Sequence, residues 1–112
     1  MAYKKERLEK AIEKELTMIL FNDIKDERLH YVSITNVDLT NDFSIATVYY
    51  RVMGTQDQID NTTKVLNEAM GFIRTKLAHA VQMRKVPSLI FKYDFSLEKM
   101  ERIEEILKGI DK

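Results

Sequence analysis

Apolar and polar residues follow one another with a period that changes several times along the chain, and each change marks a new predicted element. Over residues 4–22 the apolar positions recur at spacings of three and four, which predicts an amphipathic helix. Residues 31–39 alternate, which predicts a strand, and a change of phase within it predicts a β-bulge near Thr35 and Asn36. Residues 43–53 alternate again after a polar turn at 40–42, so the two strands are predicted to form a hairpin.

A second helical pattern begins at residue 57 and continues to about Lys85, with a glycine, Gly71, in its interior. Glycine disfavours a helix, and on a straight helix Phe72 would point into water while its neighbours pack. We therefore predict a kink at Ala69, Met70 and Gly71 that turns the two halves so that each buries an apolar side. For Gly71 itself, a close approach of the helix to a strand and a functional role explain the glycine equally well. The two are compatible, because a kink that packs well also brings backbone N–H groups within reach of a binding partner.

The last quarter of the chain is predicted to form a third strand and a final helix. Pro87 ends the preceding helix, and residues 89–95 alternate. Ser96 is a suitable helix cap, Glu98 is favourable in the first turn, and Gly109 is a suitable stop. This helix is expected to bury the side that carries Met100, Ile103, Ile106, Leu107 and Ile110.

The resulting order of elements is helix, strand, strand, kinked helix pair, strand and helix, which predicts one α+β domain over residues 1–112. The first helix and the kinked pair are expected to cover one face of a three-stranded sheet. The sheet is expected to be mixed, because the long connection between the second and third strands lets those two run parallel.

Composition and charge narrow the class of function. The chain has 112 residues and no cysteine, which excludes disulfides, thiolate catalysis and cysteine-bound metal. No apolar run approaches the ~18 residues of a membrane span, and the first residues lack the apolar core of a signal peptide, so we expect a cytoplasmic protein without membrane contact. The formal net charge is zero, but residues 61–87 hold five basic side chains and one acidic one, a net charge of +4.

Residues 69–87 contain no acid and four basic residues, namely Arg74, Lys76, Arg84 and Lys85. A solvated helix face is the ordinary interpretation of such a run, but solvated faces usually interleave both signs, as residues 4–15 do. We therefore interpret the second arm of the kinked helix as a basic surface that contacts phosphates, with salt-dependent affinity and little sequence specificity. Lys4, Lys5 and Arg7 are expected to add to this surface.

Three runs of sequence carry a resemblance to a known family: residues 34–49 (I-T-N-V-D-L-T-N-D-F-S-I-A-T-V-Y), 71–78 and 83–94. Together with the Ala-x-Gly junction at 69–71, where ordinary KH domains have a G-x-x-G loop, they resemble bacterial ribosome-binding factor A and its type II KH fold over nearly the whole chain. The resemblance implies an assembly factor that binds the free 30S subunit and 16S rRNA. It also implies a role in late 16S rRNA maturation, including 5′-end processing, and in growth in the cold, without catalysis or a cofactor.

Two details of the resemblance concern how RNA would be recognised. An Ala-x-Gly junction leaves less room than G-x-x-G for splayed single-stranded bases, so we expect the junction to favour folded rRNA shape. Many family members read Asp-Pro-Arg before the first strand, where this chain has Asp26-Glu27-Arg28. Arg28 is the candidate rRNA contact in that segment.

The remaining candidate residues have a structural interpretation. His30 and His79 lack neighbouring ligands and are expected at the surface, so no metal site is predicted. Tyr49, Tyr50 and Tyr93 could stack bases, although packing in the sheet is the commoner role.

Two other classes of function remain. A protein-interaction module of the same fold, meeting a ribosomal protein or a partner chain, would leave apolar stripes only partly covered within a monomer. A small hydrolase would need a pocket with perturbed titratable groups. The expected state is a monomer.

Overall fold

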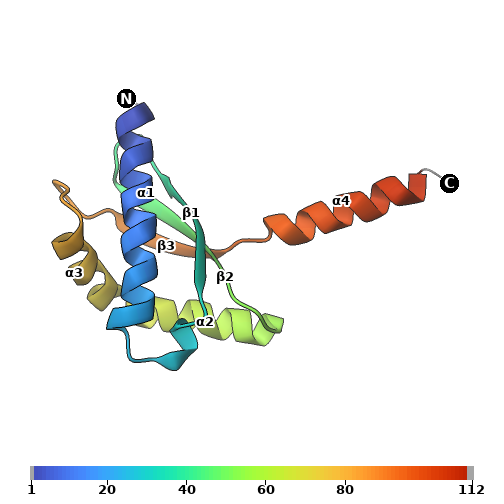
Figure 1. The fold of residues 1–112 in the computed structure, drawn as a ribbon, viewed down its shortest axis with the longest axis horizontal. Helices are drawn as coiled ribbons and strands as arrows, with labels where there is room; N and C mark the ends of the chain where they lie inside the picture. Colours follow the sequence, from blue (N-terminus) through green and yellow to red (C-terminus); the bar gives the residue numbers. More distant parts are fainter. Residues whose placement is uncertain (1, 111–112) are drawn as a thin grey trace.

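The computed structural model describes residues 2–110, in which helices pack against one side of a small sheet and a last helix extends away from it (Figure 1). The elements are α1 (Ala2–Met18), a π-helical turn (Ile19–Asp23), a short 3-10 turn (Glu27–Leu29), β1 (Ser33–Leu39), β2 (Ile45–Arg51), α2 (Gln56–Glu68), α3 (Met70–Ala80), β3 (Ser88–Tyr93) and α4 (Ser96–Ile110). The order matches the predicted one, and the α+β class is confirmed.

The three strands form a mixed sheet in the order β1-β2-β3. β1 pairs with β2 antiparallel, and β2 pairs with β3 parallel, as the long connection between them predicts. The pairing of β1 shifts register between Ile34 and Asn36, which confirms the predicted bulge. β2 is the central strand, and its residues Ala46, Val48 and Tyr50 are fully buried on the covered face.

The core lies between this face and the helices. α1 packs on β1, α2 packs on β3, and α3 lies beside α1 (Figure 1). The fully buried side chains from the helices are those of Ile12, Leu16, Leu66, Ile73 and Leu77. Tyr50 is buried among them with its hydroxyl hydrogen-bonded to Thr63, so the core interpretation of this tyrosine is confirmed.

The predicted kink exists, but its geometry differs in two ways. The break lies at Ala69 (φ −87°, ψ 3°), and Gly71 is in the first turn of α3, where an added Cβ would meet no atom within 4 Å. The predicted close approach of Gly71 to a strand is therefore wrong. Phe72 remains 45% exposed, so the prediction that the kink would bury it is wrong too. Ile73 points into the core. Because successive helical residues are turned about 100° from one another, Phe72 then points away from the core.

The second helical arm is shorter than predicted. α3 ends at Ala80, and residues 81–87 form an irregular loop instead of continuing the helix to Lys85. Val81 is extended (φ −119°, ψ 125°) and donates its N–H to the carbonyl of Leu77. The helix ends here because the chain turns back toward β3, with Val81 and Pro87 both buried on the way. Arg84 and Lys85 consequently lie on a loop.

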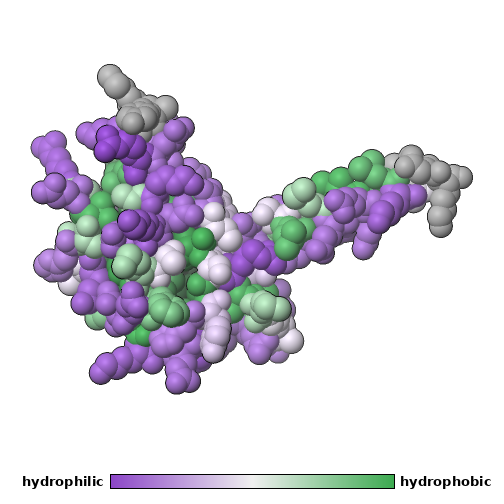
Figure 2. All heavy atoms as spheres, in the orientation of Figure 1, coloured by the Kyte–Doolittle hydropathy of each residue, from purple (hydrophilic) through white to green (hydrophobic). Residues whose placement is uncertain are grey.

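The predicted burial of α4 is wrong. Its apolar side chains are all half-exposed, between 50% and 61%: Leu97, Met100, Ile103, Ile106 and Leu107. Figure 2 shows them as an apolar band along one side of a helix that extends away from the domain. The side chain of Ile110 lies outside the described part of the structure, and the helix continues through Gly109 instead of stopping there.

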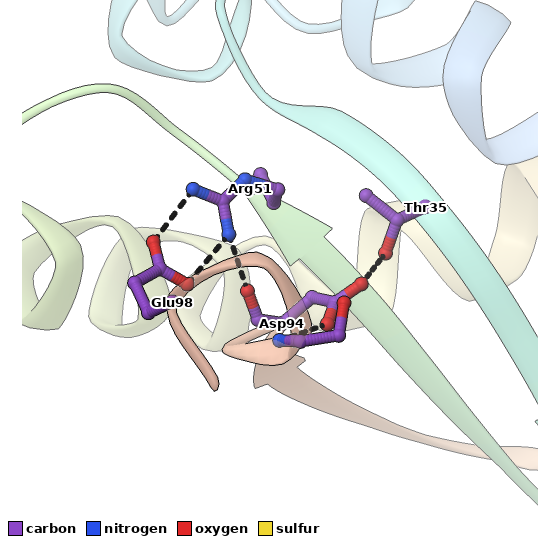
Figure 3. Close-up of polar contacts among 5 residues, drawn as sticks. Thr35, Arg51, Asp94 and Glu98 are labelled. Carbon is purple, nitrogen blue, oxygen red and sulfur yellow. Dashed lines mark hydrogen bonds and ion pairs between the residues drawn. The ribbon is translucent and has the colours of Figure 1, made fainter. Parts of the chain in front are cut away.

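A polar network holds the start of α4 against the sheet (Figure 3). Arg51 makes two hydrogen bonds to the Glu98 carboxylate, of 2.7 and 2.9 Å, and a third to the Asp94 carbonyl. The Asp94 carboxylate accepts the hydroxyl of Thr35 and the N–H of Ser96. Ser96 is therefore the first residue of the helix instead of its predicted cap, and Asp94 satisfies its N–H. These hydrogen bonds lower the pKa of Asp94, and those from Arg51 lower the pKa of Glu98. The direction of α4 is therefore set by hydrogen bonds at its first turn.

Two leucine-to-alanine substitutions compare the core with the exposed helix. Leu77 on α3 is fully buried and Leu107 on α4 is 55% exposed. Leu77→Ala should lower the free energy of unfolding by about 2–5 kcal/mol, because it removes buried apolar area and leaves a cavity. Leu107→Ala should lower it by less than about 0.5 kcal/mol. Urea unfolding followed by circular dichroism measures both, and a similar cost at the two positions would show that α4 packs on the domain in solution.

Candidate nucleic-acid interface

A groove of about 1020 Å³ lies where the first half of α1, the turn between β1 and β2, and the loop 81–87 meet. Its basic lining consists of Lys4, Arg7, Arg84 and Lys85, all exposed. Between them the groove is lined by half-buried apolar side chains, among them Leu8, Phe43 and Met83. The groove thus combines basic edges with an apolar floor.

Hydrogen bonds between the three segments hold the walls of the groove together. The Glu9 carboxylate on α1 accepts the backbone N–H of Leu39 at 2.8 Å, which ties the helix to the end of the edge strand β1. Lys5 donates to the side chain of Asn41 in the turn at 3.4 Å. The N–H of Ser88, where the loop enters β3, donates to the Ser44 carbonyl at 2.9 Å. The groove is therefore bounded by connected segments.

Arg74 supports the loop from below. Its guanidinium Nη2 donates to the Val86 carbonyl at 3.1 Å, and its Nε is buried against the protein. The side chain is only partly exposed, in contrast to Arg84 and Lys85 on the loop itself. The structure thus gives Arg74 a positioning contact, whereas the basic run in the sequence predicts a phosphate ligand like its neighbours.

One acidic residue, Asp42, shares the lining with the four basic ones. Its carboxylate accepts the hydroxyls of Thr40 and Ser44, each at 2.7 Å, and the N–H of Ser44 at 3.1 Å. These bonds, above all the one from the Ser44 hydroxyl, lower the pKa of Asp42 from 3.8 to about 2. Asp42 is therefore ionised at neutral pH and serves to lock the turn, while the groove keeps an excess of positive charge.

The predicted rRNA-binding residues fall into two sets. Lys4, Arg84 and Lys85 line the groove, and Lys5 contacts the turn beside it. Lys76 lies outside on the exposed side of α3, with its ammonium 5.6 Å from the centre of the Phe72 ring.

Arg28 lies outside the groove as well, in the 3-10 turn. It is held by the Asp26 carboxylate through bonds of 2.6 and 3.0 Å, which lower the pKa of that acid. The junction residues Ala69, Met70 and Gly71 are at the opposite end of α3 from the loop.

Two groove residues, Phe43 and Met83, were missed by the sequence analysis. Phe43 has φ +60°, a conformation that favours glycine or asparagine, and a phenylalanine beside a polar turn was the one available signal. The two histidines differ in exposure. His79 is exposed, as predicted. His30 is half-buried, with Nε2 2.8 Å from the Ile24 carbonyl, so its prediction as a surface residue is wrong.

The part of the chain that the structure describes contains no cluster of metal-ligating side chains. None of its helices over residues 2–110 is long and apolar enough to cross a bilayer.

The fold places the chain in a class: α+β domains of type II KH-like topology, here with a basic groove beside the β1–β2 turn. Within that class, the family model for ribosome-binding factor A matches residues 4–107, and the chain belongs to this family.

Individual relatives agree with this assignment. Ribosome-binding factor A of Staphylococcus carnosus is 40% identical over 107 residues, covering 96% of this chain and 93% of the relative. That of Desulforamulus reducens is 39% identical, covering 99% and 92%. The crystal structure of ribosome-binding factor A from Thermus thermophilus superposes with a TM-score of 0.71 at 26% identity, covering 80% of this chain and 94% of that one. The resemblance inferred from the sequence is confirmed.

The contact between Arg74 and the loop can be tested by substitution. Arg74→Gln removes the charge-assisted bond to the Val86 carbonyl, which is worth about 1.5–3 kcal/mol, and should loosen the loop. Backbone amides at 82–86 should then exchange with deuterium faster than in the wild type. Lys76→Gln, on the same helix but exposed, should leave them unchanged. Unaltered exchange in Arg74→Gln would show that this bond does not hold the loop.

The lowered pKa of Asp42 gives a test by titration. Because its pKa in the folded state, about 2, is below the ordinary 3.8, its ionised form stabilises the turn above about pH 4, and this stabilisation is lost as the pH falls toward 2. Carbon-detected NMR titration should give a midpoint near 2, and Ser44→Ala should raise it toward 3.8. Ser33→Ala, outside the turn, is the control. An ordinary midpoint in the wild type would rule out the hydrogen-bonded turn.

Proposed function

We propose that this chain acts as a single, monomeric RNA-binding domain in the cytoplasm, which binds the free 30S subunit through the groove. The observation that carries the proposal is the convergence of Lys4, Arg84 and Lys85 from distant parts of the chain on one groove, in a protein of the ribosome-binding factor A family. The 30S subunit exposes 16S rRNA phosphates, and basic side chains at the edges of a groove suit them.

The proposed role is assistance in late maturation of 16S rRNA, including processing of its 5′ end, and support of growth in the cold. Membership of the family supports this role. The protein would act without catalysis or a cofactor: phosphate neutralisation and shape would supply the binding energy. Lys5 would add a weaker contact beside the groove, and Lys76 would extend the surface along α3. Arg28, in the 3-10 turn away from the groove, would make a separate contact with rRNA.

A second candidate function rests on α4. Its apolar band, with Met100 61% and Leu107 55% exposed, is the uncovered stripe that a protein-interaction module would show. In this alternative, α4 docks on a ribosomal protein or a partner chain, and the groove contributes little. The polar network at Arg51 and Glu98 would hold the helix in position to dock.

Co-sedimentation with purified 30S subunits over a salt series distinguishes the two functions. Wild-type protein should pellet with the subunit at low salt and be released as salt rises, because phosphate contacts exchange with counterions. Arg84→Glu/Lys85→Glu should weaken binding on the order of tenfold or more at fixed salt. The matched control Lys25→Glu/Lys64→Glu makes the same charge change at exposed positions outside both the groove and α4 and should bind like the wild type.

A groove variant that remains folded and pellets as well as the wild type would refute the groove as the docking surface. If, in addition, Met100→Asp/Leu107→Asp abolishes co-sedimentation, docking through α4 replaces it. These two positions are exposed, so the double variant should keep the fold.

A further inference from the structure

The floor of the groove is more apolar than a phosphate site requires. Leu8, Phe43 and Met83 lie half-buried between the basic edges. Phosphates are held by basic and N–H groups, whereas the flat faces of unpaired bases stack on aromatic side chains. An apolar, aromatic floor beside a basic edge can therefore bind both the base and the phosphate of a nucleotide.

Phe43 occupies a backbone conformation that its side chain disfavours. Its φ of +60° is the only positive value at a non-glycine residue among residues 2–110. The turn imposes this value: the Phe43 N–H donates to the Thr40 carbonyl at 2.9 Å, and the Asp42 carboxylate bonds to Thr40 and Ser44 on either side. Strained residues of this kind persist where the surroundings fix them, and they concentrate at functional sites.

Packing is the competing explanation for this phenylalanine. One part of Phe43 packs against the core, and any apolar side chain of similar size could do the same. The two explanations differ in one property: packing needs an apolar side chain, while stacking on a base needs an aromatic ring.

We propose that the groove binds a short single-stranded RNA segment, with an unpaired base stacked on Phe43 and the adjoining phosphates held by Lys4, Arg84 and Lys85. The volume of about 1020 Å³ is at the upper end of small-ligand pockets and accommodates a nucleotide together with its neighbour. This inference rests on the proposed function and specifies the kind of RNA recognised. The Ala69 junction, where we expected little room for splayed bases, lies at the other end of α3.

Fluorescence anisotropy with a labelled pentauridylate, and with a blunt RNA duplex for comparison, tests the inference. Phe43→Leu keeps an apolar side chain and should weaken pentauridylate binding on the order of tenfold. Phe43→Tyr keeps the ring and should bind within about twofold of the wild type. Phe72→Leu makes the same change at a 45% exposed phenylalanine on α3, outside the groove, and should have no effect.

The salt dependence separates the two kinds of contact. Arg84→Ala/Lys85→Ala should flatten the plot of log affinity against log salt, because phosphate contacts are lost. Phe43→Leu should lower the affinity at every salt concentration and leave the slope unchanged, because stacking releases no counterions.

Three results would overturn the inference: Phe43→Leu binding as tightly as the wild type, Phe43→Tyr binding as weakly as Phe43→Leu, or a preference for the duplex. The proposed function would survive each of them as long as the groove variant still fails to pellet with 30S subunits. If Phe43→Leu proves unfolded by circular dichroism, wild-type protein is cross-linked to pentauridylate containing 4-thiouridine. Cross-links should map to Phe43 or Met83, and cross-links confined to other elements would overturn the inference.

Discussion

The parallel pairing of β2 with β3 is the constraint that organises both ends of the molecule. Ser88 pairs with Ile45 and Tyr93 with Tyr50, so after β2 the chain must travel back along the whole sheet before β3 begins. This return connection consists of α2, α3 and the loop 81–87. Its helices cover one face of the sheet, and its end places the loop beside the β1–β2 turn. The groove forms at that end. At the other end β3 leaves beside Arg51, and α4 starts there.

Most of the fold follows from local pattern because one face of each strand is buried. Alternation located the three strands, and the change of phase in β1 located the bulge between Ile34 and Asn36. The position at which α3 ends does not follow from the local pattern. Val81 continues the three-and-four spacing from Leu77 and is buried in either conformation, so the pattern cannot separate a helix that continues from a chain that turns toward β3. The basic residues were found, but their placement on a loop was not.

α4 shows a different limit of pattern. A hydrophobic side on a helix says that some of its surface is suited to burial, and does not say which molecule covers it. The pattern in α4 predicts packing on the core of the same chain. The structure instead directs the helix outward through the bonds of Arg51 to Glu98 and Asp94, contacts between residues 43 or more positions apart that no local pattern contains. Packing within the chain therefore does not account for the apolar band on α4, and binding to another molecule would account for it.

The arginines show why a count of charges locates a binding surface only approximately. Arg28 and Arg51 form ion pairs with carboxylates. Their N–H donors bond within the protein, and the neighbouring carboxylate largely neutralises their positive charge. Arg74 bonds through Nη2 to a carbonyl, which is neutral, so this bond does not cancel its positive charge. Because the Debye length is about 8 Å at physiological salt, a charge directly beneath the loop still adds to the potential around it. Arg74 therefore fixes the loop that presents Arg84 and Lys85 and also strengthens the field in which they act.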